Sequence, residues 1–240
     1  MTPFRLKRAL LSPYVWYMRR RFASAPEFGR SLLEAQYYRP TMFRWLRRFQ
    51  ATPDLLHDAP LGPDGVVFDV GGYTGEWAGR IVELHDPRVF VFEPNPACFA
   101  ALDERFRDRK KVRCLRYGLH DSDATLPLGQ EGWGSSIFPE GVRENAPRAT
   151  VSVRDAARVF EEIAPGGVDL LKLNIEGAEY EVLDRLLETG WMTNVRILLV
   201  QFHEWRAGAY GRRRAIRRRL AKTHSLEWDY PFIWEKWVRR

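Results

Sequence analysis

The chain has 240 residues, of which 45% are hydrophobic and 29% are charged, and its formal net charge is +7. This length permits one α/β core but no second globular domain, and the composition indicates neither internal repeats nor disorder. The two cysteines are too few for a disulfide framework and the five histidines show no metal-binding spacing, so we expect a cytoplasmic protein with reduced thiols and no required metal.

Positive charge is concentrated at the two ends of the chain. The net charge is +9 for residues 1–50 and +8 for residues 205–240, whereas residues 51–204 carry −10. Basic segments of this kind suit anionic lipid, anionic glycan or nucleic acid. The pattern therefore predicts two basic ends that flank an acidic middle.

Residues 1–63 are predicted to form a basic, aromatic helical extension or lid. The apolar stretch 9–18 is too short to span a bilayer, and three arginines follow it. Either it makes peripheral contact with the inner face of the membrane or it packs as a helix on the core, and both interpretations stay open. Apolar residues near helical spacing predict one or two helices over 28–50, and a proline-rich connection follows.

The next segment, residues 66–96, shows a strand, a glycine turn, a helix and a second strand that ends in a carboxylate. Glycines let the backbone approach a ligand, and an acid about 20 residues further on takes the hydroxyls of a ribose. The unit therefore predicts a site for an adenosine cofactor. The residues expected to hold it are Asp69, Gly71, Gly72, Tyr73, Gly75, Glu93 and Asn95.

Two features of this unit indicate which adenosine cofactor is bound. The dinucleotide pattern Gly-x-Gly-x-x-Gly requires a glycine where this chain has Tyr73. Asp69 at the strand end would also repel a pyrophosphate, whereas a carboxylate suits a cationic ligand. S-adenosyl-L-methionine carries a positive sulfonium and a positive ammonium, so it is the cofactor that we expect.

The middle of the chain contributes two predicted loops. Residues 117–121 follow a strand near 111–116, and Asp121 would either accept a hydrogen bond from the adenine amine or simply cap a turn. The second loop, residues 132–136, carries Trp133, Ser135 and Ser136. An aromatic face and hydroxyls suit a sugar ring, although Gly-Ser loops also serve only as turns. These three residues are the predicted substrate contacts.

The segment Lys172-Leu-Asn174-Ile-Glu176-Gly-Ala-Glu179 follows on the fourth predicted strand. Together with the glycine turn and the Glu93-Pro-Asn-Pro step, it makes the chain resemble the FkbM-type family of class I S-adenosylmethionine-dependent methyltransferases. The resemblance covers roughly residues 64–204. It implies a class I methyltransferase fold, and O-methylation of a sugar or a similar natural product, glycolipid or polysaccharide.

One position departs from the family pattern. Asn174 stands where the family usually has aspartate. An amide can orient a substrate hydroxyl or the amino group of the cofactor, but it cannot take a proton. Asn174 is therefore predicted to face the acceptor without acting as a base.

The end of the fifth predicted strand carries His203, which we predict to be the catalytic base. An aliphatic hydroxyl holds its proton tightly at neutral pH, and the ordinary histidine pKa near 6.5 suits proton removal. Glu176 would orient this histidine or share the proton. The alternative is a structural histidine that is only hydrogen-bonded. The catalytic interpretation is favoured by position, since ligands bind at this edge of such sheets.

The C-terminal region is predicted to close the sheet. The basic helix 212–223 presents either a solvated outer face or a contact with phosphates. Two alternating segments, 226–230 and 232–238, predict an antiparallel pair joined at Pro231. This ending is the one that the family resemblance leads us to expect.

The predicted fold is therefore α/β, with a doubly wound, mostly parallel, seven-stranded Rossmann-like sheet in a methyltransferase domain over residues 64–240. Strands are expected near 66–70, 88–92, 111–116, 168–174 and 195–202, with helices near 75–85, 96–106, 154–164 and 178–189. We expect an O-methyltransferase that acts on a small-molecule or glycan acceptor and has no nucleic-acid partner. The alternatives are an RNA methyltransferase and a non-catalytic, membrane-associated methyltransferase-like protein.

Overall fold

The computed structural model describes residues 39–129, 135–142 and 145–240. The chain divides into two units, Met1–Phe43 and Arg44–Arg240, and both sheets belong to the second unit. The apolar stretch 9–18 and most of the predicted lid lie outside the described residues. The predicted domain boundary at residue 63 stays a prediction.

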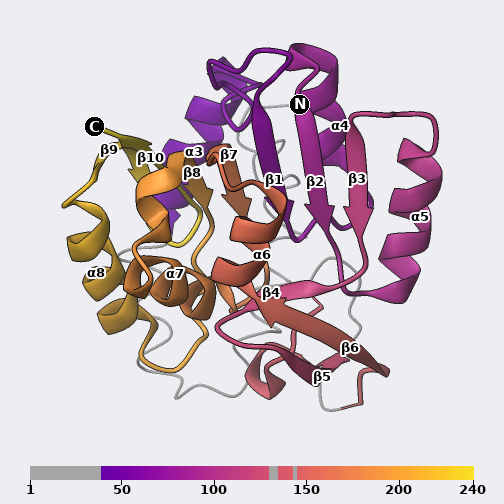
Figure 1. The fold of residues 1–240 in the computed structure, drawn as a ribbon. Helices are drawn as coiled ribbons and strands as arrows, with labels where there is room; N and C mark the ends of the chain where they lie inside the picture. Colours follow the sequence, from indigo (N-terminus) through magenta and orange to yellow (C-terminus); the bar gives the residue numbers. More distant parts are fainter. Residues whose placement is uncertain (1–38, 130–134, 143–144) are drawn as a thin grey trace, which may run out of the picture. The chain divides into compact units, whose positions relative to one another are not determined.

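The larger sheet of the described chain has seven strands in the order β3-β2-β1-β7-β8-β10-β9 (Figure 1). Its first five strands are parallel, whereas β10 is antiparallel to both of its neighbours. This arrangement confirms the predicted doubly wound sheet and the closing antiparallel pair. The strands are β3 (Val112–Leu115), β2 (Arg88–Phe92), β1 (Val66–Val70), β7 (Val168–Leu173), β8 (Val195–Val200), β10 (Trp234–Arg239) and β9 (His224–Tyr230).

Helices cover both faces of this sheet, which is why the central strands are apolar at nearly every position. All five residues of β1 are buried. One face packs against α6 (Ala156–Ile163), α7 (Glu179–Glu188) and α8 (Ala209–Leu220), and Figure 1 shows α6 and α7 in front of the strands. Two helices that connect neighbouring parallel strands are α4 (Glu76–His85) and α5 (Pro96–Phe106). The helix α3 (Arg39–Ala51) precedes the sheet, and η4 (Trp191–Asn194) precedes β8.

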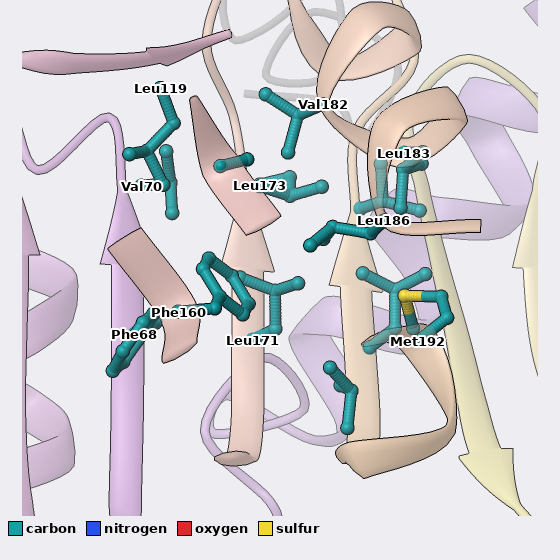
Figure 2. Close-up of a cluster of buried hydrophobic side chains, with 14 of the residues drawn as sticks. Phe68, Val70, Leu119, Phe160, Leu171, Leu173, Val182, Leu183, Leu186 and Met192 are labelled. Atoms are coloured by element: carbon teal, nitrogen blue, oxygen red, sulfur yellow. The ribbon is translucent and has the colours of Figure 1, made fainter. Parts of the chain in front are cut away.

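The core between the sheet and α6–α7 is built from large apolar side chains (Figure 2). Phe160 of α6 lies edge-on to Phe68 of β1, with 4.6 Å between ring centroids. Leu171 and Leu173 of β7 are fully buried beside them. Burying each such side chain contributes about 1.5–3 kcal/mol, so this cluster fixes β1 and β7 relative to each other.

A smaller sheet of three strands was not predicted. Its order in the described residues is β4-β6-β5, with β4 (Gly118–His120), β5 (Ala124–Gly129) and β6 (Arg148–Asp155). The segment 117–121 was expected to be a loop, and a helix was expected from residue 154. The first expectation is wrong, because β4 pairs with β6 in parallel. The predicted helix near 154–164 is present, but α6 begins two residues later, at Ala156. Figure 1 shows the small sheet beyond the carboxyl ends of β1 and β2.

Local sequence explains where several elements begin. Asn95 caps α5 by accepting a hydrogen bond from the Ala97 N–H, and Pro96 occupies the first helical turn. Asp155 caps α6 by accepting from the Arg158 N–H. The described helices include none that is both long and apolar enough to cross a membrane.

Candidate active site

A cavity of about 330 Å³ opens at the carboxyl ends of β1, β2 and β7. This volume lies within the usual range for small-molecule sites, and strand carboxyl ends are where open α/β sheets bind their ligands. The glycine turn after β1 forms one wall, and Glu93 after β2 forms the next. Leu119 of β4 and Val153 of β6 also line the cavity, so the small sheet supplies part of its wall.

The glycine turn is packed so tightly that side chains are excluded. A Cβ atom on Gly71 would lie 2.0 Å from the backbone oxygen of Asn174, and one on Gly72 would lie 2.1 Å from Cγ1 of Val91. The backbone of Gly71 is left-handed, with φ +85°, which favours glycine. Both amides donate to the Phe92 carbonyl, at 3.0 and 3.1 Å. The turn is therefore held between β2 and β7 with its backbone against the cavity.

Glu93 is buried at the cavity wall and accepts two backbone hydrogen bonds. The Tyr73 N–H donates to Oε2 and the Asn95 N–H donates to Oε1, both at 2.8 Å. Burial raises the pKa of Glu93 to about 7, although the two backbone hydrogen bonds act in the opposite direction. Each carboxylate oxygen can accept more than one hydrogen bond, so Glu93 retains capacity for the hydroxyls of a ribose.

Asp69 lies beneath the glycine turn and is paired with Lys172. The Lys172 Nζ donates to Asp69 Oδ1 at 2.8 Å and to the Gly71 carbonyl at 2.7 Å. Lys172 lines the cavity, whereas Asp69 is fully buried behind it. The described residues leave Asp69 Oδ2 without a hydrogen-bond partner. The carboxylate that we expected to face a cationic cofactor thus compensates a lysine, to which the sequence analysis gave no role.

His203 is buried between two glutamates, each of which lies more than twenty residues before it in the sequence. Its Nδ1 lies 3.0 Å from Glu179 Oε1 and its Nε2 lies 3.2 Å from Glu176 Oε1. Its backbone N–H also donates to Glu179 Oε1, and its carbonyl accepts from the Tyr180 hydroxyl. Glu179 further accepts from the Gly177 N–H at 2.9 Å. The three side chains therefore form a fixed Glu179–His203–Glu176 triad.

The triad changes the expected chemistry of His203. Burial alone would lower its pKa, but the charges and hydrogen bonds of Glu176 and Glu179 raise the pKa well above its usual value. The ring is then protonated at neutral pH, and both nitrogens donate to carboxylates. Such a ring cannot accept a proton from a substrate. Glu176 is the member of the triad that lines the cavity.

The predicted substrate residues are placed differently from one another. Ser135 lines the cavity, and its Oγ accepts from the Asn95 side chain at 3.3 Å. Ser136 is buried and donates to the Glu176 carbonyl at 2.7 Å, so it supports the backbone of Glu176, which has a φ of +51°. Trp133 lies outside the described residues.

Asp121 is exposed and directly follows β4. It accepts hydrogen bonds from the Ser122 hydroxyl and lies 2.8 Å from Nδ1 of His120. It is not among the described residues that line the cavity. This placement favours the turn interpretation over an adenine contact.

Apolar side chains form the remaining wall of the cavity, and the sequence analysis missed them. They include Leu56, Trp77, Ile137, Ile175 and Trp234. The indole N–H of Trp77 donates to the Leu56 carbonyl at 3.0 Å, which fixes the ring. The sequence offered a signal for the cavity only at Trp77, which lies just after the glycine turn. Leu56 and Trp234 are far from that turn along the chain.

The basic helix α8 is largely neutralised by its neighbours. Arg212 and Arg219 pair with acids of α7, and Arg213 and Arg217 pair with Asp229 and Glu235 of the C-terminal strands. These contacts explain the arginine-rich sequence as a means of attaching α8 to the sheet. The described residues contain no group of three or more His, Cys, Asp or Glu that could hold a metal ion, and the expectation of no required metal stays a prediction.

This chain is similar in sequence and in fold to several known proteins. A family model described as a methyltransferase FkbM domain matches residues 69–221. The methyltransferase sdnD of Sordaria araneosa is 25% identical over 195 residues, which cover 67% of this chain and 72% of that protein. A crystal structure of a provisionally assigned rRNA methylase from Clostridium thermocellum has a TM-score of 0.51 at 11% identity, covering 80% of this chain and 94% of the other. That likeness shows a shared fold.

Proposed function

The chain belongs to the methyltransferase FkbM family, and from this premise we propose that it transfers a methyl group to a hydroxyl of a sugar-containing acceptor. Its cofactor is S-adenosyl-L-methionine, as the family match shows. The single observation that carries the acceptor proposal is the composition of the cavity. It combines an apolar wall with two indole rings, which suits the face of a sugar, and a carboxylate for a hydroxyl proton.

The residues present fit this cofactor. The glycine turn admits a ligand against its backbone, and Glu93 offers acceptor oxygens beside it. Asn174 Oδ1, a buried polar atom of a residue that lines the cavity, has no partner among the described residues, as expected where a polar ligand completes the site. When bound, the cofactor supplies a methyl group that is already activated by a sulfonium.

In the proposed mechanism the protein aligns the acceptor and removes its proton. Trp77 and Trp234 would hold the sugar ring, and Glu176 would accept the proton of the acceptor hydroxyl. His203 and Glu179 keep the Glu176 carboxylate in place, since His203 Nε2 lies 3.2 Å from it. Alignment contributes several kcal/mol, and a positioned base adds about 10²–10⁴-fold to the rate.

The charge of the cavity supports a neutral acceptor over RNA. Lys172 is the only cation among the described lining residues, and Asp69 already compensates it. A phosphate-rich acceptor would be expected to meet several uncompensated basic side chains. The cytoplasmic location and the peripheral membrane contact through the basic N-terminus stay predictions.

The test is methyl transfer from labelled S-adenosylmethionine to a panel of sugars and glycosides, with the product located by mass spectrometry. The Glu176→Gln variant should lower kcat by about 10²–10⁴-fold, because it cannot accept a proton. Affinity for S-adenosylhomocysteine should stay the same in that variant.

Glu76→Gln is the matched control, because Glu76 also lines the cavity but its carboxylate accepts from the Thr74 hydroxyl. This variant should keep kcat within about threefold of the wild type, in the range of surface substitutions. Equal kcat for wild type and Glu176→Gln would contradict the assignment of the base. Methylation of RNA but of no sugar would overturn the acceptor proposal.

A further inference from the structure

Lys172 has a donor that the hydrogen bonds among the described residues do not use, and its ammonium lies 5.8 Å from the centre of the Trp77 ring. An ammonium group has three donors, and the structure accounts for two of them through Asp69 Oδ1 and the Gly71 carbonyl. Its side chain is only 5% exposed, yet Lys172 lines the cavity. A buried cation that borders a ligand cavity with a donor remaining is suited to bind an anion.

Asn174 supplies the complementary feature. It follows β7 two residues after Lys172, and alternate residues of an extended chain share one face. Its Oδ1 is buried and has no hydrogen-bond partner among the described residues, although Asn174 also lines the cavity. Buried acceptors in native structures are nearly always satisfied, so a donor from the ligand is expected at this atom.

We propose that Lys172 and Asn174 together bind the amino-acid end of S-adenosylmethionine. The ammonium of Lys172 takes the α-carboxylate of the cofactor, and Oδ1 of Asn174 accepts from its α-ammonium. A zwitterion needs one cation and one acceptor close together, and these two residues provide that pair. The inference rests on the cofactor of the proposed function but not on its acceptor.

The position of Gly71 connects this pair with the nucleoside side of the cavity. The amide of Gly71 donates to the Phe92 carbonyl, directly before Glu93, and its carbonyl accepts from Lys172. The glycine turn thus lies between the carboxylate suited to a ribose and the pair suited to an amino acid. This order matches a ligand with a nucleoside at one end and an amino acid at the other.

The same assignment accounts for the residue types at positions 69 and 174. Asp69 compensates the burial of the Lys172 charge, which is why a carboxylate is required at a position that does not border the cavity. Asn174 can replace the aspartate typical of the family because an amide oxygen accepts from an ammonium as a carboxylate does. Proton removal at residue 174 is not needed for this role.

Calorimetric titration with three ligands tests the inference without turnover. The ligands are S-adenosylhomocysteine, its decarboxylated analogue and 5′-methylthioadenosine, which lacks the amino-acid end. Wild type should bind S-adenosylhomocysteine about 10- to 100-fold more tightly than the decarboxylated analogue, which is the usual range for a hydrogen bond to a charged group.

The informative variant is the double substitution Lys172→Met with Asp69→Asn, because Lys172→Met alone would leave a buried, uncompensated carboxylate. It should bind S-adenosylhomocysteine and the decarboxylated analogue within about threefold of each other. Asp69→Asn alone is the matched control: it leaves the carboxylate of the ligand as the partner of Lys172, so, once circular dichroism shows that the variant is folded, its discrimination should be at least as large as that of the wild type. Affinity for 5′-methylthioadenosine should be the same in all three proteins.

Two results would overturn the inference. The double variant could retain the full preference for the carboxylate, or its affinity for 5′-methylthioadenosine could fall in parallel, which would show that Lys172 only supports the glycine turn.

For Asn174, the Asn174→Ala variant should lose the preference for S-adenosylhomocysteine over its deaminated analogue, while Asn174→Asp keeps it. Failure of all sugars as acceptors with these preferences intact would remove the sugar proposal alone.

Discussion

Two groups of buried carboxylates lie at the same edge of the sheet and are stabilised in opposite ways. Glu93, after β2, accepts hydrogen bonds from the backbone amides of Tyr73 and Asn95, and burial raises its pKa to about 7. Glu176 and Glu179, after β7, enclose His203. Burial opposes protonation of that ring, but the two acids raise its pKa well above the usual value.

The difference shows how one residue type can serve two purposes in one cavity. A carboxylate held only by neutral amides keeps acceptor capacity and suits neutral donors, such as ribose hydroxyls. Carboxylates clamped by an imidazolium are fixed in position and charge, which suits a group that must meet a substrate in one orientation. The Glu93 site is therefore adapted to binding, and the triad to positioning.

The largest expected effect comes from removing the cation of the triad. His203→Leu leaves Glu176 and Glu179 buried next to each other without compensation, so the free energy of unfolding should fall by about 3–5 kcal/mol near pH 6.5. Urea denaturation followed by circular dichroism measures it. A loss below about 1 kcal/mol would show that the carboxylates are not held charged by His203.

His224→Leu is the matched control for that substitution. His224 is also buried, but its ring binds the Val195 carbonyl and lies against the Thr223 hydroxyl, and burial lowers its pKa. Its loss should cost only about 1–3 kcal/mol. The stability contributions of His203 and His224 should change with pH in opposite directions. The contribution of His203 is complete below pH 6.5 and falls as pH rises through its folded pKa, whereas that of His224 falls as pH drops below 6.5.

The next largest effect should appear at the binding carboxylate. Glu93→Gln keeps one acceptor oxygen but places an amide N–H against a backbone N–H, so affinity for S-adenosylhomocysteine should fall by about 10- to 100-fold. Calorimetry measures this affinity, and kcat at saturating cofactor should change little. A large fall in kcat with unchanged affinity would reverse the roles that we assign to the two carboxylate groups.

The smallest effect is a pH dependence of the wild-type protein. The ionised form of Glu93 is the better acceptor for ribose hydroxyls, and its pKa of about 7 places the transition near neutrality. Affinity for S-adenosylhomocysteine should therefore rise about tenfold from pH 6 to pH 8, following the ionised fraction. The Glu93→Gln variant should show a flat profile over this range. A wild-type profile that is equally flat would indicate that Glu93 is ionised throughout.

Local pattern was sufficient for the parallel sheet and for one half of the site. The strand, glycine turn, helix and second strand of residues 66–96 follow from short-range periodicity and from the conformational needs of Gly71. Glu93 was predicted at the cavity because its distance from the turn along the chain fixes its place at the neighbouring strand end. The closing pair β9–β10 was also predicted, since alternation over two adjacent segments is a local signal.

Only the tertiary structure decided the rest. Asp69 and Lys172 are 103 positions apart, and His203 meets Glu179 across 24 positions, so no local pattern shows that they pair. The small sheet escaped prediction because β4 is three residues long and gains its hydrogen bonds from the distant β6. Backbone periodicity is set by neighbours in the chain, whereas burial and the partners of charged groups are set by packing. The sequence by itself therefore determined the fold class and the cofactor, and packing decided which side chains face the ligand and which carry charge.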